Sequence, residues 1–237
     1  MANIALIIAG GVGTRMHQDI PKQFLSVNDK PIIVYTMEAF QNHSNIDAIY
    51  IACLNGWQEI LKAYIKQFNI TKAIKVVDGG KNGQDSIRNG VFAIAEEYKE
   101  NDLILIHDAI RPMLSEDIIS ENIAICKKFG NAVTVIPCME AMLKSEDEIE
   151  SEESILRNSL FRAQTPQTIS VDNAVKLHKV ALQKGITNSV ATCTLLLELG
   201  YKVYFAKGSE LNIKITTTDD ITIFKALLSM KKSPWMK

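Results

Sequence analysis

Short apolar runs alternate with segments of helical spacing along most of the chain. A short apolar run bounded by turn residues is typical of a buried strand, and apolar residues three or four positions apart are typical of a helix packed on a sheet. The runs that predict strands are Ile4–Ala9, Ala48–Cys53, Ile74–Val77, Leu103–Ile106, Ala132–Ile136, Lys202–Ala206 and Asn212–Thr216. The segments that predict helices are Ile32–Gln41, Gln58–Phe68, Asp85–Tyr98, Ser115–Phe129, Val171–Lys184, Ser189–Leu199 and Asp219–Met230.

Strands that are apolar on both faces and separated by helices predict a mostly parallel sheet covered on both sides. This is the doubly wound α/β, or Rossmann-like, plan. The alternation is interrupted between Pro137 and Thr165, where six acidic residues fall within residues 145–154 and predict a solvated hairpin tip. We therefore expect one domain over residues 1–230, a protruding β-arm over residues 138–165, and a tail over residues 231–237.

Composition narrows the class of protein. The 237 residues are 47% hydrophobic and 22% charged, which is typical of a folded globular chain. A net charge of -1 gives no long-range attraction to nucleic acid or to an anionic membrane. The four cysteines lie far apart and form no CxxC pair, which fits reduced thiols better than zinc ligands or disulfides. We expect a cytoplasmic protein with no nucleic-acid or membrane partner, because the apolar run Ile4–Ala9 is also too short for a signal or a span.

The first predicted strand leads into "AGGVGTRM", which places three glycines, Gly10, Gly11 and Gly13, before Arg15. Glycines after a first parallel strand let backbone N–H groups approach a phosphate. The stretch lacks the GK[ST] ending of a P-loop, and Met16 stands where a dinucleotide fingerprint needs a third small residue. Two interpretations remain from spacing alone: a phosphate-binding loop with separate cations, Arg15 and Lys22, or a tight turn with two solvated cations.

A set of motifs in fixed order resembles one enzyme family. The stretches are "AGGVGTRM" with "PKQFL" over residues 9–25, "DGG" with "DSI" over 78–87, "HDAIRP" over 107–112, "LRN" with "QTPQ" over 156–167, and "NIKITT" over 212–217. Together they resemble the polyol-phosphate cytidylyltransferases, which act on 2-C-methyl-D-erythritol 4-phosphate or ribitol 5-phosphate. The resemblance implies CMP transfer from CTP to a small polyol or sugar phosphate, with Mg²⁺ as cofactor, by a homodimer whose arms interlock.

The resemblance also implies roles for individual residues. CTP would contact Ala9, Gly10, Gly11, Gly13, Gly80, Asp85, Ser86 and Asp108. Arg15, Lys22 and Lys214 would be the catalytic cations around the α-phosphate, and Asp108 would lie next to Mg²⁺. The acceptor would contact Arg111, Thr187 and Arg157, the last of these in a neighbouring subunit.

Such a reaction needs cations more than it needs a base. The nucleophile is a phosphate monoester, which is mostly dianionic at neutral pH because its second pKa is about 6. The barrier is repulsion between anions and growing charge on the α-phosphate, which positioned cations and a metal relieve. His107 is therefore predicted to order the Asp108 loop by hydrogen bonding, and His17 to be a surface residue. Asp219 and Asp220 are predicted to begin a helix after Thr218.

Several departures from the family pattern fall where the acceptor should bind. Glu140 and Ala141 replace an Asp-Thr pair, Asn188 replaces an aspartate, and Leu211 replaces a polar or acidic residue. Gly83 stands in the region of a family arginine. The nucleotide motifs are intact, so we expect a cytidylyltransferase. The ribitol-5-phosphate type is favoured over the methylerythritol type because "GGVGTRM" with "PKQFL" and "NIKITT" resemble it more. Methylerythritol phosphate, or another polyol or sugar phosphate used for a surface polysaccharide, remains an alternative acceptor.

Two other classes of function share this fold. A dinucleotide-dependent oxidoreductase would need an acidic residue after the second strand, where this chain has Cys53-Leu54-Asn55. A non-catalytic nucleotide-binding relative would fit the altered acceptor residues. Because such a relative would not need the full set of cations, the presence of that set in this chain favours an enzyme.

Overall fold

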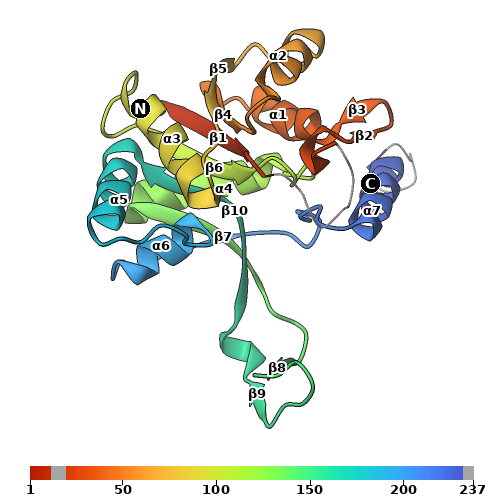
Figure 1. Cartoon of the computed structure of the whole chain (residues 1–237), viewed down its shortest axis with the longest axis vertical. Helices are drawn as coiled ribbons and strands as arrows, with labels where there is room; N and C mark the ends of the chain where they lie inside the picture. The colour runs from red at the N-terminus through yellow and green to blue at the C-terminus, as the bar shows by residue number, and fades with distance from the viewer. Residues whose placement is uncertain (12–19, 232–237) are drawn as a thin grey trace.

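A twisted seven-stranded sheet forms the centre of the molecule (Figure 1). The computed structural model describes residues 1–11 and 20–231. The strand order is β11-β7-β10-β6-β1-β4-β5. The bounds are β1 Asn3–Ala9, β4 Ala48–Cys53, β5 Ala73–Asp78, β6 Leu103–Asp108, β7 Asn131–Pro137, β10 Phe161–Ser170 and β11 Phe205–Lys207.

All strand pairs in this sheet are parallel except those made by β10. The predicted parallel, doubly wound plan is thus confirmed, but the hydrophobic pattern did not predict β10. This strand runs antiparallel between β6 and β7 and carries the sequence "FRAQTPQTIS". Its centre is polar and contains Pro166, so it lacks the apolar alternation of the other strands. The arm consequently returns to the sheet at Phe161, which lies opposite Pro137, rather than at Thr165.

Helices cover both faces of the sheet. The helices are α1 Ile32–Asn42, α2 Gln58–Gln67, α3 Gly83–Ala95, α4 Glu116–Phe129, α5 Val171–Gln183, α6 Thr192–Glu198 and α7 Thr218–Lys231, with 3-10 turns η2 Lys22–Phe24 and η3 Arg157–Ser159. Apolar residues of α1, α2 and α4 form the core on one face, and those of α3, α5 and α6 form the core on the other. The helix predicted over Ser189–Leu199 begins three residues late, at Thr192.

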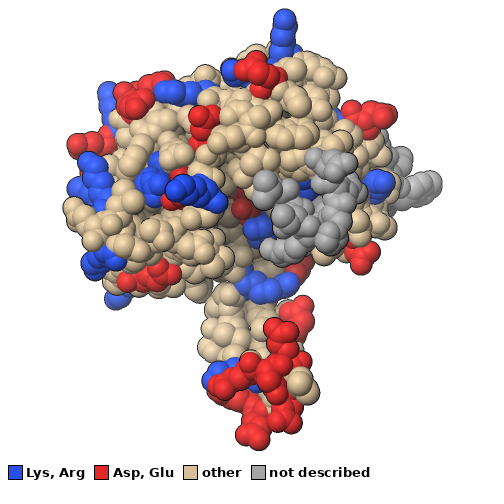
Figure 2. Space-filling view, in the orientation of Figure 1, with Lys and Arg blue, Asp and Glu red and all other residues tan. Residues whose placement is uncertain are grey.

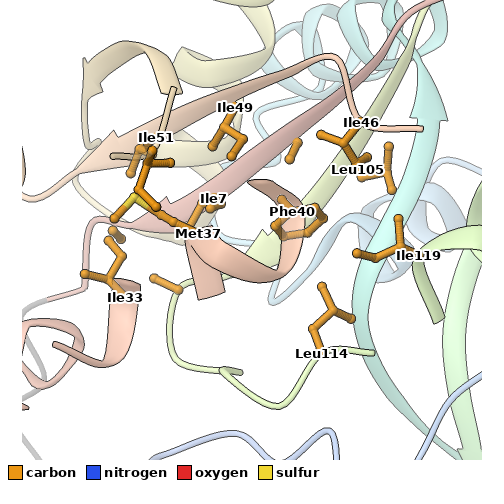
Figure 3. Close-up of a cluster of buried hydrophobic side chains, with 14 of the residues drawn as sticks. Ile7, Ile33, Met37, Phe40, Ile46, Ile49, Ile51, Leu105, Leu114 and Ile119 are labelled. Atoms are coloured by element: carbon orange, nitrogen blue, oxygen red, sulfur yellow. The ribbon is translucent and has the colours of Figure 1, made fainter. Parts of the chain in front are cut away.

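The strands alternate between these two cores. Ile7 belongs to the first core and Leu6 to the second, as the period of two in a strand requires. Figure 3 shows Met37 and Phe40 of α1 among the strand side chains Ile7, Ile49 and Ile51. The central strands are therefore fixed on both sides, which holds their carboxyl ends in place.

Two local predictions have opposite outcomes. The Ser115 cap is confirmed, since its hydroxyl accepts a hydrogen bond from the Ile118 amide at the start of α4. The strand predicted over Asn212–Thr216 is wrong, because this segment is irregular. Its apolar side chain Ile215 is buried beside Phe224 of α7 in a separate small core. The alternation of its residues reflects this packing and not pairing in a sheet.

Between Pro137 and Phe161 the chain leaves the sheet and extends away from it (Figure 1). We call residues 138–160 the arm. It ends in a two-stranded sheet formed by β8 (Met142–Lys144) and β9 (Glu153–Ile155). Figure 2 shows acidic side chains gathered at its tip, as the sequence predicts. A second small sheet pairs β2 (Ser26–Val27) with β3 (Lys30–Pro31).

Within the part of the chain that the structure describes, no helix has the length and apolar content needed to cross a bilayer.

Candidate active site

A cavity of about 340 Å³ lies at the carboxyl ends of β1 and β6. Ligands of open parallel sheets bind outside these strand ends. The lining comes from β1 and β6, the start of α3, the middle of β10, the start of α6 and the segment before α7: Ile8, Gly83, Ile87, Ile106, His107, Asp108, Arg111, Ala163, Gln164, Thr165, Gln167, Val190, Ala191, Thr192, Cys193, Thr194 and Lys214. Segments distant in sequence therefore meet at one place.

Asp108 forms two ion pairs in this cavity. Its Oδ2 lies 3.1 Å from Nζ of Lys214 and 3.1 Å from Nε of Arg111. Burial alone would raise the pKa of the Asp108 carboxyl, but the charges of Lys214 and Arg111 outweigh burial and hold that pKa below its ordinary value. The carboxylate is thus ionised at neutral pH. Two cations and one anion leave the cluster with a net positive charge, which suits a phosphate.

His107 is buried behind this cluster and supports it. Its Nε2 lies 3.2 Å from the Arg111 carbonyl, and its Nδ1 lies 3.0 Å from Oγ1 of Thr165. Burial lowers the pKa of His107 to about 4, so the ring is neutral at pH 7. A carbonyl only accepts hydrogen bonds, so Nε2 carries the proton and Nδ1 accepts from the Thr165 hydroxyl. That hydroxyl accepts the Asp108 amide at 3.1 Å, which confirms the predicted ordering of the Asp108 loop by His107.

Buried amide side chains hold the segment before α7 in place. Arg111 donates from Nη1 to the Asn212 carbonyl at 2.8 Å. Asn212 itself is fully buried and donates to the Thr165 carbonyl at 2.8 Å, and Gln164 donates to the Ser209 carbonyl at 2.9 Å. These bonds place Lys214 beside Asp108. The sequence pattern did not assign roles to Gln164 and Asn212, although both lie inside motifs that it singled out.

The glycine loop after β1 lies close to the segment between β5 and α3. A Cβ added to Gly10 would lie 2.6 Å from Oγ of Ser86, so this position has no room for a side chain. Gln23, another residue without a predicted role, donates from its buried amide to the carbonyls of Ala9 and Gly11, both at 2.9 Å. The structure thus brings together Gly10 and Ser86, two of the residues predicted to contact CTP.

Gly80, Asp85 and Ser86 are neighbours at the start of α3. The Gly80 amide donates to Oγ of Ser86 at 3.0 Å, and a Cβ on Gly80 would overlap the backbone of Asp85 and Ser86. Asp85 pairs with Arg88 at 2.8 Å. Gly80 therefore allows its loop to pack directly on the first turn of α3.

Three cations predicted at the phosphates differ in placement. Lys214 lines the cavity. Lys22 begins η2, which is anchored by buried Phe24 stacked on Trp57 with 4.7 Å between ring centroids. Arg15, like Gly13 and His17, lies outside the described residues.

Comparison with known proteins points to one family. The model of the family described as IspD, 2-C-methyl-D-erythritol 4-phosphate cytidylyltransferase, matches residues 3–230. The chain belongs to this cytidylyltransferase family. Its doubly wound fold also matches that of the IspD from Francisella tularensis, with a TM-score of 0.81 at 25% identity over 95% of this chain and 99% of that one.

Relatives of this IspD-family chain carry two different names. A ribitol-5-phosphate cytidylyltransferase of Lacticaseibacillus paracasei is 42% identical over 230 residues, which are 96% of this chain and 98% of the relative. A 2-C-methyl-D-erythritol 4-phosphate cytidylyltransferase of Clostridium botulinum is 37% identical over 228 residues, 95% of this chain and 97% of the relative. These relatives are nucleotidyltransferases, which excludes the oxidoreductase alternative and supports the enzyme class predicted from the motifs.

The predicted acceptor residues are spread over the cavity, the loop after α5 and the arm. Arg111 lines the cavity, whereas Thr187 lies in the segment just before the part of the wall that begins at Val190. Arg157 lies on the arm, where it donates to the Met139 carbonyl at 2.9 Å, and it is not part of the cavity lining. A Cβ on Gly83 would meet no atom within 4 Å, so this departure from the family pattern leaves open space in the cavity.

Proposed function

We propose that this IspD-family chain transfers CMP from CTP to ribitol 5-phosphate and releases pyrophosphate. The observation that carries the proposal is the Asp108 cluster, with Lys214 and Arg111 paired on one carboxylate at the wall of the cavity. Asp108 lies opposite Ile8, the strand residue that leads into the glycine loop. The acceptor follows from the higher identity to relatives named for ribitol 5-phosphate than to those named for methylerythritol phosphate.

The chemistry is an in-line displacement at phosphorus. An oxygen of the acceptor phosphate forms a bond to the α-phosphorus of CTP, the bond to the bridging oxygen of the β-phosphate breaks, and pyrophosphate leaves with both electrons. Lys214 contacts the α-phosphate, while Lys22 and Arg15 bind the triphosphate along the glycine loop. His107 stays neutral and takes no proton. Catalysis comes from positioning and from charge stabilisation, as in other phosphoryl transfers.

Mg²⁺ fits this arrangement as a partner of the triphosphate. Among the described residues, no cluster of three or more histidine, cysteine or acidic side chains could hold a metal by itself. Mg²⁺ commonly binds through one or two carboxylates plus substrate phosphates. Asp108 is the one carboxylate in the described lining of the cavity, and it would supply that protein ligand. When bound, the ion would neutralise charge on the phosphates.

A pyrophosphate-release assay tests the proposal. CTP, UTP and ATP are each combined with ribitol 5-phosphate, methylerythritol phosphate and a panel of other polyol and sugar phosphates. CTP with ribitol 5-phosphate should give the highest kcat/KM. Arg15→Ala and Lys22→Ala should each lower kcat by roughly 10²–10³ while changing CTP affinity far less, because their best contacts form as the α-phosphate gains charge. Unchanged turnover in both variants would contradict the assigned roles.

Methylerythritol phosphate is the second candidate, since the matching family model is named for it. Ala141 and Asn188 lack the hydroxyl and carboxylate of the family pattern, so hydrogen-bond partners for that polyol are missing. A site built to bond a substrate hydroxyl can discriminate by roughly 10⁴–10⁵, and this discrimination is lost with its partners. Equal kcat/KM for the two acceptors would show that these residues do not set specificity.

We also propose a homodimer joined through the arm. The arm exposes large apolar side chains, with exposed fractions of 67% for Met139 and Leu143, 88% for Ile149 and 80% for Leu156. An isolated two-stranded extension is marginally stable in water, and contact with a second copy would cover these side chains. In such a dimer Arg157 would reach the neighbouring active site.

Subunit complementation tests this arrangement. A chain with Arg157→Ala and a chain with Arg15→Ala each lack one contribution to every site of their own homodimer. A heterodimer contains one site with both native residues, so mixing should restore part of the activity. Mixtures shown to contain heterodimers but lacking any recovery would argue against a shared site.

A further inference from the structure

The buried side chain of Gln84 bridges two segments that serve different substrates in the proposed reaction. Gln84 lies in the first turn of α3, directly before Asp85 and Ser86 of the nucleotide segment, and its exposed fraction is 3%. Its Nε2 donates to the Ile186 carbonyl at 2.7 Å, and its Oε1 accepts the Ser189 amide at 2.6 Å. One amide therefore satisfies two backbone groups of the loop after α5.

A second side chain of the same turn contacts this loop. Asn82 donates from Nδ2 to the Thr187 carbonyl at 2.9 Å. Its Oδ1 accepts the Asp85 amide at 2.9 Å, so the same side chain caps α3. We call residues 186–191 the acceptor loop, because the loop includes Thr187 and continues into the wall of the cavity at Val190.

The far end of the acceptor loop is also fixed. The Ser189 hydroxyl donates to Glu198 of α6 at 2.8 Å, and the Cys193 amide donates to Oε1 of Gln167 at 2.8 Å. On the near side Gly185 has a φ of +69°, a left-handed conformation that ends α5. Between Gly185 and Ser189, the side-chain hydrogen bonds to the loop backbone come from Asn82 and Gln84 among the residues described.

From this geometry we infer that Gln84 is a positioning residue that couples the two substrate sites, an inference that rests on the proposed function. Bound CTP contacts the first turn of α3 and immobilises it. Gln84 and Asn82 then hold the acceptor loop in the conformation that receives the polyol phosphate. CTP consequently strengthens acceptor binding, and by linkage the acceptor strengthens CTP binding by the same factor.

Kinetics of four variants separate this role from a merely structural one. Gln84→Ala removes both bonds to the loop, and Gln84→Glu keeps an acceptor for the Ser189 amide but loses the donor to Ile186. Asn82→Asp keeps the helix cap and loses the donor to Thr187. Gln183→Ala is the matched control, because Gln183 is an exposed glutamine at the end of α5.

Gln84→Ala should raise the KM for ribitol 5-phosphate at saturating CTP at least about tenfold, since two buried hydrogen bonds are lost, and should change the Kd for CTP measured without acceptor less than about twofold. Gln84→Glu and Asn82→Asp should give smaller increases of the same kind, and Gln183→Ala none. A Kd for CTP that rises as much as the acceptor KM, or an unchanged acceptor KM, would overturn the inference. If Gln84→Ala does not fold, Gln84→Glu and Asn82→Asp decide the result.

Hydrogen exchange provides a readout that does not depend on turnover. CTP should slow exchange of the Ser189 amide in the wild-type chain and not in Gln84→Ala. If the wild-type chain does not turn over ribitol 5-phosphate, the proposed function is refuted. The effect of CTP on exchange of the Ser189 amide would still test the coupling, because that measurement needs no acceptor. Equal protection by CTP in the wild type and in Gln84→Ala would show that the loop is held without Gln84.

Discussion

Replacement of His107 tests whether the buried network behind Asp108 holds the site together. The ring accepts from the Thr165 hydroxyl at 3.0 Å and donates to the Arg111 carbonyl at 3.2 Å. It also packs edge-on against Phe40, with 5.3 Å between ring centroids. His107→Leu fills the same space with an apolar side chain of similar size, but it leaves the Thr165 hydroxyl and the Arg111 carbonyl without their partner.

The magnitude follows from these two bonds. A buried polar group left without a partner costs about 1–3 kcal/mol, so the two groups in His107→Leu should lower the free energy of unfolding by about 2–6 kcal/mol. Loss of the hydrogen-bonded chain also frees the Asp108 loop, and a misplaced catalytic group can cost about 10²-fold in rate. We therefore expect kcat/KM to fall by about 10–100-fold in protein that is still folded at 25 °C.

Two smaller changes divide the effect. His107→Asn places an amide oxygen near the position of Nδ1 and can still accept from Thr165. His107→Gln places an amide nitrogen near the position of Nε2 and can still donate to the Arg111 carbonyl. Urea unfolding and the pyrophosphate assay should each show partial recovery relative to His107→Leu. A loss of less than about 1 kcal/mol with unchanged kcat/KM in His107→Leu would refute a supporting role for the network.

Three further changes have defined outcomes. Burial lowers the pKa of both His107 and His178 to about 4, so the unfolded chain binds more protons than the folded chain between pH 6.5 and 4. The free energy of unfolding, measured with urea, should therefore fall as the pH falls through this window, by up to about 3 kcal/mol per histidine. Gly90→Ala places a methyl group against the Leu6 side chain, and overpacking of about 1–3 kcal/mol should exceed the gain in helix propensity of about 1 kcal/mol, which calorimetry would detect as a lower Tm. Asp108→Asn should raise the Mg²⁺ concentration for half-maximal rate about tenfold if Asp108 is the protein ligand of the ion; an unchanged Mg²⁺ dependence would exclude that role.

The hydrophobic pattern was sufficient to predict the strands and helices that are buried through apolar side chains. Ala48–Cys53 was predicted with the observed bounds, because every residue of that strand is buried and apolar. The pattern did not predict β10, because this strand is buried through polar contacts. Gln167, with an exposed fraction of 4%, donates to the sulfur of Cys193 at 3.3 Å, and Thr168 donates to Asn122 at 3.2 Å. Burial of this kind depends on partners distant in sequence, which a local pattern does not contain.

The sequence likewise predicted the charged residues of the candidate site but not the amide side chains that support them. The motifs placed Asp108, Arg111 and Lys214 in one site, and the structure brings them together through ion pairs of 3.1 Å. The supporting amides Gln84 and Asn212 were not assigned, since a buried glutamine or asparagine resembles a surface residue in the sequence. The role of such a residue can be assigned only when the backbone groups that its side chain hydrogen-bonds are known.

The junction of the arm with β7 and β10 has a consequence for how this chain can vary. Pro137 and Phe161 are paired across the sheet, so residues 138–160 form one closed loop whose ends are fixed by the strands. The entropy of closing a flexible loop grows only with the logarithm of its length, and doubling the length costs about 0.6 kcal/mol. The tip can therefore gain or lose residues with little effect on folding of the sheet, which leaves it free to change its contacts while the catalytic end of the molecule stays constant.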